Sequence, residues 1–208
     1  MWTHGPVIPR RMQHLRPYIC PFDKLLTHIE PRSRVLDVGC GRGLFLGLLH
    51  HARLLAPAPV ATSVGFDCSR EAIVIARMMA RRAGAGNSVR FERRDAADTW
   101  PAGVFDAVSI IDVMHHLPLH ARRTVVHQAA SRVRPGGVLL YKDMTPRSWR
   151  SLANSMHDLA VAREWVTYTP VASVEAWAQE AGLRLHHAEA FERLWYGHEL
   201  RVFVKPEA

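Results

Sequence analysis

An aspartate followed by three alternating glycines is the part of this sequence best suited to bind a ligand. Asp37 lies in the apolar run 35–38, and Gly39, Gly41 and Gly43 follow it. Glycines adopt positive φ angles and let the backbone approach a ligand, whose polar groups then meet free N–H groups at the start of a helix. The spacing lacks the third-glycine offset of dinucleotide sites and the Lys-Ser/Thr of phosphate loops. Because the Asp37 carboxylate would repel phosphate, the pattern favours a cationic or amine-bearing ligand.

Apolar runs of strand length alternate with helical patterns along the chain. Ser69 is expected to cap a helix over 70–82, and Gly182 to end another over 171–181. Such alternation predicts an α/β fold with a parallel sheet and right-handed crossovers, in which ligands bind at the carboxyl ends of the strands. The other expected helices are 22–29, 43–55 and 118–133. The expected strands are 35–38, 60–66, 89–91, 105–112, 183–190 and 198–204, and a further strand follows a turn at 135–137 and ends at 143.

The glycine motif resembles motif I of the class I S-adenosylmethionine-dependent methyltransferases, and four further motifs follow in the order of that family. The resemblance implies a Rossmann-like methyltransferase fold with a mostly parallel seven-stranded sheet of order 3-2-1-4-5-7-6, flanked by helices. It also implies S-adenosyl-L-methionine as cofactor and S-adenosyl-L-homocysteine as product. The further motifs are Gly65-Phe66-Asp67, the run from Phe91 to Ala96, the run from Phe105 to Leu117, and the run from Val133 to Leu140.

The resemblance implies roles for the residues at the strand ends. Asp37 and the glycine loop would hold the amino-acid part of the cofactor, and Asp67 would accept hydrogen bonds from the ribose hydroxyls. A helix-capping role for Asp67 is the alternative. Asp95, or the neighbouring Asp98, would meet the adenine amino group. The complete expected cofactor-binding set is Asp37, Gly39, Cys40, Gly41, Gly43, Asp67, Cys68, Asp95, Ala96 and Ile111.

A second chemical group follows the expected fourth strand. An imidazole titrates near neutral pH and can take a proton from a phenol or a carboxylic acid, so we predict that His116 is the general base. Asp112 and Asp143 are expected to point toward the acceptor as further catalytic groups. The alternative is a structural turn in which one histidine of the pair 115–116 bonds the backbone. Two carboxylates and a histidine could also hold a metal, but metal-free transfer is favoured because the adjacent histidine pairs are poorly placed to share an ion.

Residues 144–170 are predicted to form an insertion over the acceptor side. Aromatic and apolar residues recur in it at roughly helical intervals, which also fits plain packing. Trp149, His157 and Tyr168 are the expected substrate contacts. The chain of 208 residues is expected to form one domain, 1–208, with an N-terminal cap segment at 1–31.

Composition limits the possible settings and partners. No apolar stretch reaches the roughly 18 residues of a spanning helix, and the N-terminal residues do not form a secretory signal. Three cysteines without metal spacing favour the cytoplasm. The net charge of +8 suits an acidic protein or a nucleic acid, although the arginines are scattered over several helices.

Together with the resemblance, these patterns predict an S-adenosylmethionine-dependent enzyme that O-methylates a small apolar or aromatic metabolite, either free or presented by an acidic carrier protein. An RNA methyltransferase is an alternative that the charge supports. However, the Asn/Asp-Pro-Pro-aromatic motif of amino-methylating enzymes is replaced by Ile111-Asp112-Val113-Met114. A non-catalytic scaffold that binds the cofactor is the other alternative.

Overall fold

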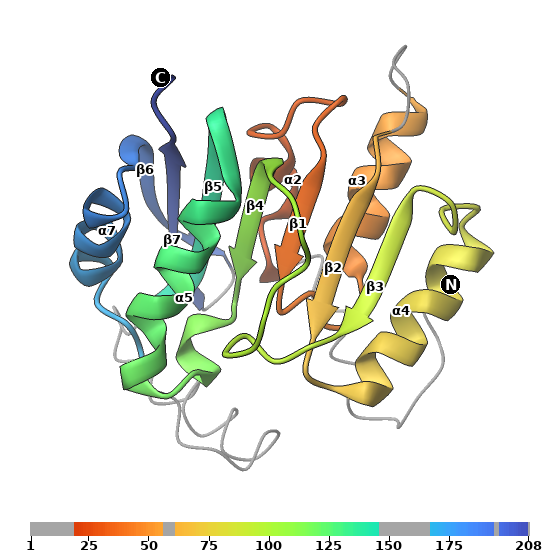
Figure 1. Ribbon diagram of the computed structural model, residues 1–208, viewed down its shortest axis with the longest axis horizontal. Coiled ribbons are helices and arrows are strands. Elements are labelled where there is room, and N and C mark those ends of the chain that lie inside the picture. Colours follow the sequence, from red (N-terminus) through yellow and green to blue (C-terminus); the bar gives the residue numbers. More distant parts are fainter. Residues whose placement is uncertain (1–18, 56–60, 146–166, 194–195, 208) are drawn as a thin grey trace. The chain divides into compact units, whose positions relative to one another are not determined.

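The strands form one mixed sheet of order β3-β2-β1-β4-β5-β7-β6, which confirms the order implied by the resemblance (Figure 1). The computed structural model describes residues 19–55, 61–145, 167–193 and 196–207. The elements in chain order are α2 (Phe22–Leu26), β1 (Val35–Val38), α3 (Leu44–Leu54), β2 (Ser63–Asp67), α4 (Arg70–Arg82), β3 (Val89–Arg93), β4 (Phe105–Ile111), the 3₁₀ turn η1 (Met114–His116), α5 (Leu119–Arg132), β5 (Val133–Thr145), α7 (Val171–Glu180), β6 (Arg184–Arg193) and β7 (Tyr196–Val204).

Contacts between residues divide the chain into two compact units, Met1–Thr99 and Trp100–Ala208. The expectation of a single domain over 1–208 stays a prediction. Within the residues that the structure describes, no helix combines the length and the apolar character needed to cross a membrane.

The first unit contains three parallel strands, with β1 beside β2 and β2 beside β3. All four residues of β1 are buried, as expected for a strand of a parallel sheet that is covered on both faces. Helix α4 packs against β2 and β3, and α3 packs against α4. Ser69 caps α4 as predicted, because its side chain accepts a hydrogen bond from the Ala72 N–H at 3.2 Å.

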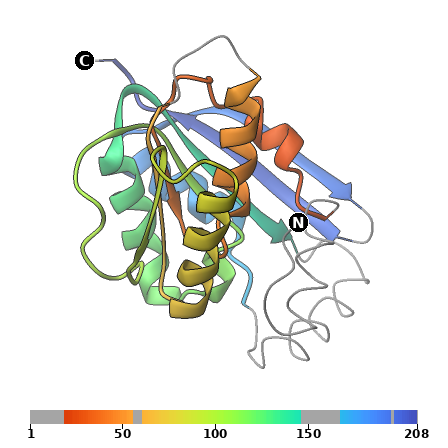
Figure 2. The same cartoon turned by 90° about the vertical axis from the view of Figure 1, so that its right-hand side faces the viewer.

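The second unit joins a parallel pair, β4 and β5, to an antiparallel series, β5, β7 and β6, whose long strands lie side by side in Figure 2. Helix α5 packs against β4, β5 and α7. The predicted helix over 171–181 is confirmed as α7, and Gly182 follows its end with a φ of 81°.

Strand β5 is longer at both ends than the sequence predicts. It begins at Val133, so Pro135-Gly136-Gly137 lies inside an irregular strand rather than in a turn before it, and the register with β4 shifts between Phe105 and Ala107. A Cβ at Gly137 would lie 2.8 Å from the Asp106 carbonyl oxygen, which explains the glycine. The strand ends at Thr145, so the first two residues of the predicted insertion belong to it.

Candidate functional site

The glycine loop of the first unit is fastened to the end of β2 by backbone donors. Gly39, Gly41 and Gly43 have φ angles of 63°, 53° and 78°, the left-handed region that favours glycine. The Gly41 N–H donates to Oδ2 of Asp67 at 2.9 Å, and the Ser69 N–H donates to Oδ1 of the same carboxylate at 2.8 Å. Asp67 therefore positions the loop between β1 and α3 and the turn that begins α4. Each carboxylate oxygen keeps a second lone pair for a further donor.

Packing by itself requires a glycine at two positions of this region. A Cβ on Gly43 would lie 2.5 Å from Cζ of Phe91, and a Cβ on Gly65 would lie 2.9 Å from Cβ and Sγ of Cys40. Real Cβ atoms do not come this close to their neighbours. The geometry thus gives Gly43 a role in seating α3 against β3, and the expected contact of Gly43 with the cofactor stays a prediction.

Carboxylates surround both cysteines that were expected at the cofactor site. Cys40 is buried, and its burial together with the charges of Asp37 and Asp67 raises the pKa of its thiol well above the ordinary value. Cys68 is exposed, and partial desolvation with the charges of Asp67 and Asp95 raises its pKa as well. Both thiols therefore remain protonated near neutral pH. Asp37 is itself only 2% exposed, which places a carboxylate beneath the glycine loop.

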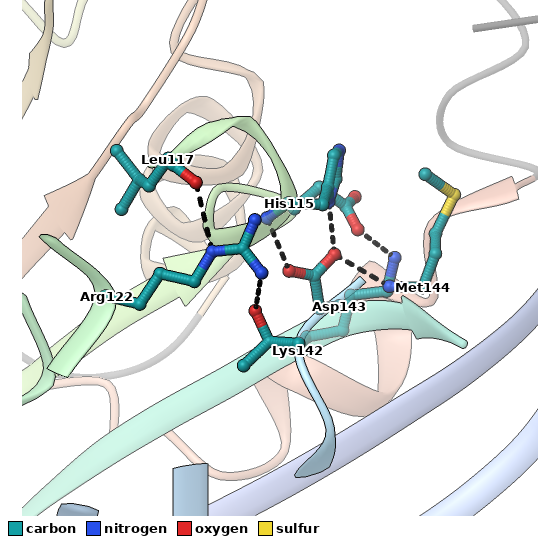
Figure 3. Close-up of polar contacts among 8 residues, drawn as sticks. His115, Leu117, Arg122, Lys142, Asp143 and Met144 are labelled. Atoms are coloured by element: carbon teal, nitrogen blue, oxygen red, sulfur yellow. Dashed lines mark hydrogen bonds and ion pairs between the residues drawn. The ribbon is translucent and has the colours of Figure 1, made fainter. Parts of the chain in front are cut away.

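The second unit holds a buried histidine–carboxylate pair at the end of β5. Nδ1 of His115 makes a short hydrogen bond with Oδ1 of Asp143, whose other oxygen accepts the His115 backbone N–H at 3.3 Å. The Met144 N–H also donates to Oδ1, at 2.8 Å. In Figure 3 the carboxylate therefore lies between His115 of the turn η1 and Met144 near the end of β5. His115 is 5% and Asp143 is 3% exposed. Asp143 therefore fixes the turn after β4 instead of facing solvent.

A second pair, Asp112 with Lys142, links the same two strand ends. Nζ of Lys142 donates to Oδ1 of Asp112 at 2.5 Å, and the Asp112 N–H donates to the Lys142 carbonyl oxygen at 2.8 Å. Lys142 is 1% exposed, and Asp112 has a φ of 55°, a strained value for a residue with a side chain. Sequence reasoning did not single out Lys142. Lys142 directly follows the apolar run 138–141, which was the signal that it is buried, although this signal does not identify its partner.

His116 is the exposed member of the histidine pair. Its ring centroid lies 4.1 Å from that of His115, so the buried ring supports the exposed one. Arg122, also missed from the sequence, is 2% exposed and donates to the Leu117 carbonyl oxygen at 3.0 Å and to Oγ1 of Thr169 at 2.8 Å. Burial lowers the pKa of Arg122, and the charge of Asp143 acts in the opposite direction. Arg122 of α5 thus holds the carboxyl-terminal end of the turn that follows β4.

The remaining predicted residues divide into described and undescribed positions. Ile111 is buried at the end of β4, Ala96 is half-buried, and Tyr168 is half-buried next to the Arg122 contact. Trp149 and His157 lie outside the described residues. Among the described residues, no three His, Cys, Asp or Glu side chains are grouped so that they could hold a metal ion.

Comparison with known proteins identifies the family. Residues 9–188 match the model of a methyltransferase domain. The chain is 31% identical over 172 residues to 27-O-demethylrifamycin SV methyltransferase of Amycolatopsis mediterranei (strain S699), covering 80% of this chain and 60% of that protein. It is 28% identical over 167 residues to the ubiquinone biosynthesis O-methyltransferase of Xanthomonas axonopodis pv. citri (strain 306), covering 76% and 66%. The matches thus span under two thirds of each relative.

Solved structures agree on the fold. Magnesium protoporphyrin IX methyltransferase from Synechocystis PCC 6803, with bound S-adenosylhomocysteine, superposes with a TM-score of 0.73 at 19% identity, covering 98% of this chain and 90% of that one. An O-methyltransferase family protein from Burkholderia thailandensis gives 0.74 at 20% identity, covering 96% and 59%. The chain therefore belongs to the class I S-adenosylmethionine-dependent methyltransferase family.

Proposed function

We propose that this protein transfers a methyl group from S-adenosylmethionine to an oxygen atom of a small apolar or aromatic metabolite. The observation that carries the proposal is the glycine loop fastened to the Asp67 carboxylate, with Asp37 buried beneath it. The names of two relatives, a demethylrifamycin methyltransferase and a ubiquinone biosynthesis O-methyltransferase, support oxygen as the acceptor atom.

The first unit supplies the groups that would hold the donor. The glycine loop offers backbone donors and little side-chain bulk, and the charge of Asp37 suits an amino group. The remaining lone pairs of Asp67 suit the two ribose hydroxyls, which are donors. When bound, S-adenosylmethionine supplies an electrophilic methyl group on a sulfonium ion. The role of the protein is then to orient the two reactants, because an in-line displacement depends on alignment.

The second unit supplies the proton acceptor in this proposal. A hydroxyl that accepts a methyl group must lose its proton, and a ring nitrogen of the exposed His116 takes it. The pair of His115 and Asp143 keeps the turn in place beneath that ring. Asp112 is engaged by Lys142 at 2.5 Å, which favours a positioning role for this carboxylate over proton abstraction.

The acceptor contacts of Trp149, His157 and Tyr168, and the presentation of the acceptor by an acidic carrier protein, stay predictions of this proposal. The net charge of +8 supports the carrier, because opposite charge speeds the encounter of two proteins.

Calorimetry with S-adenosylhomocysteine tests the donor half. Asp67→Ala removes charge-assisted hydrogen bonds of about 1.5–3 kcal/mol, so its affinity should fall by about 10- to 150-fold. Glu30→Ala removes an exposed carboxylate from the same unit and is the matched control, with unchanged affinity expected. Wild-type affinity in Asp67→Ala would overturn the assignment of this site.

A transfer assay with labelled S-adenosylmethionine tests the acceptor half. Phenols, aromatic acids, carrier-bound acyl groups and RNA are offered in parallel, and the methylated atom is identified by mass spectrometry. Transfer to a phenol or carboxylate oxygen supports the proposal. Transfer to RNA alone, or donor binding without transfer to any class, contradicts it.

A further inference from the structure

A hollow of about 680 Å³ lies in the first unit along β3, the terminal strand of the sheet. Four consecutive residues of β3, 89–92, line it, together with the turn 86–88 and the α4 residues Arg77 and Arg81. It includes the first two residues of β2 and Arg34 just before β1. The glycine loop follows the carboxyl end of β1, so the hollow is concentrated at the opposite, amino-terminal ends of these parallel strands.

The charges around the hollow are strongly unbalanced. Arg34, Arg77, Arg81 and Arg90 line it, against the single carboxylate of Glu92. That carboxylate is shared between two arginines, because it lies 2.9 Å from Nε of Arg90 and 2.6 Å from Nε of Arg94. The lining residues therefore carry an excess of positive charge that Glu92 cannot neutralise.

One arginine is fixed at the strand itself. Nε of Arg77 donates to the Phe91 carbonyl oxygen at 2.9 Å. This bond uses one of the five N–H donors of the guanidinium group and orients the others. Arg81 lies one helical turn further along α4 on the same side. Planar guanidinium groups held in this way match carboxylates with paired hydrogen bonds.

We propose that this hollow binds a short, extended, acidic segment of a partner protein. Four strand residues span about 13 Å, which is the length of a similar stretch of extended peptide. Single-stranded nucleic acids, by contrast, rely on aromatic side chains that stack on the bases. Among the residues that the structure describes, the only aromatic one lining the hollow is Phe91, which is 3% exposed and therefore offers no stacking surface. Carboxylates spaced along a peptide can pair with several arginines without such a surface.

The acidic segment would dock away from the proposed donor site, so the binding of the segment and the binding of the donor can be measured and altered independently. Fluorescence anisotropy of a labelled peptide of alternating Glu and Thr measures the docking, at low and at physiological salt. Arg81→Gln/Arg90→Gln changes two exposed residues of the hollow, and Arg123→Gln/Arg184→Gln changes two exposed arginines of the second unit. Both double variants remove two positive charges, and each breaks one exposed arginine's ion pair, that of Arg90 with Glu92 or that of Arg123 with Glu180.

The peptide should bind about tenfold more weakly to Arg81→Gln/Arg90→Gln and within about twofold of wild type to the control variant. S-adenosylhomocysteine affinity, measured on the same samples, should not change in either, and it reports on the proposed function independently. Equal losses in both variants would mean attraction by net charge alone and would overturn the proposal. Tighter binding of a labelled oligouridylate through the same arginines, or displacement of the peptide by inorganic phosphate as readily as by unlabelled peptide, would also overturn it.

Discussion

The glycine loop of the first unit and the histidine turn of the second are built in different ways. The loop is made of neighbouring residues with left-handed torsions, and one long-range hydrogen bond, from its Gly41 N–H to Asp67, fastens it. The turn is held by pairs of polar side chains that are far apart in sequence and mostly buried, since His115 and Asp143 are separated by 28 residues and Asp112 and Lys142 by 30. Substitutions at the loop should therefore impair ligand binding with the fold intact, whereas substitutions of the paired side chains that hold the turn should reduce stability and turnover together.

The largest expected effect is the loss of stability when the buried pair at the turn is broken. Asp143→Ala removes the partner of His115 and two backbone hydrogen bonds, so the free energy of unfolding should fall by about 3 kcal/mol or more. Asp106→Ala breaks a more exposed ion pair with Arg134, also 28 residues apart, and should cost at most about 1 kcal/mol. Urea unfolding measures both. Equal costs would contradict the contrast between the two regions.

The loop should lose ligand binding without a comparable loss of stability. Gly39→Val places a branched side chain at a φ of 63° beside the expected ligand, and Gly84→Val imposes the same backbone strain at a φ of 72°, where a Cβ meets nothing within 4 Å. Each should cost about 1–2 kcal/mol of stability. Only Gly39→Val should weaken S-adenosylhomocysteine binding, by about 100-fold or more. Calorimetry that shows equal affinity in the two variants would refute the role of the loop.

The exposed histidine of the turn should affect turnover alone. His116→Ala should reduce methyl transfer by on the order of 10²-fold, while S-adenosylhomocysteine affinity and the unfolding midpoint stay near those of wild type. His120→Ala, at another exposed histidine of the same unit, serves as the control and should leave all three unchanged. If turnover in His116→Ala matches the control, proton removal belongs to another group.

The smallest effect concerns the two cysteines next to the loop. Cys68 is exposed with a raised pKa, so iodoacetamide should modify it more slowly than a free thiol at pH 8 and faster as the pH rises. Buried Cys40, whose pKa is raised further, should react only after unfolding. Mass spectrometry of the labelled protein distinguishes the two sites. Bound S-adenosylhomocysteine should protect Cys68 from modification. A labelling rate that does not change when the ligand is added would contradict the placement of Cys68 at the cofactor site.

The contrast also explains how much the sequence could predict. The strands at 35–38 and 105–111, the Ser69 cap and the sheet order follow from local periodicity, capping residues and ordered motifs. The partners of Lys142 and Arg122 could not be predicted in this way, because Asp112 and Thr169 are distant from them in sequence. The length of β5 was missed for a related reason, since its two ends depend on distant partners: Val133 pairs with Phe105 before the Pro-Gly-Gly segment, and Met144 and Thr145 pair with β7.

Because Gly43 and Phe91 are in contact, substitutions at these two positions can accumulate in one order only during evolution. The Phe91 ring occupies the volume that a side chain at 43 would need, since an added Cβ would lie 2.5 Å from it. Residue 91 can become smaller first at the cost of a cavity, and only then can residue 43 gain a side chain, which still carries the penalty of its positive φ. The reverse order passes through a steric clash. Descendants should therefore keep this glycine as long as they keep the aromatic ring, so the two positions are inherited as one unit.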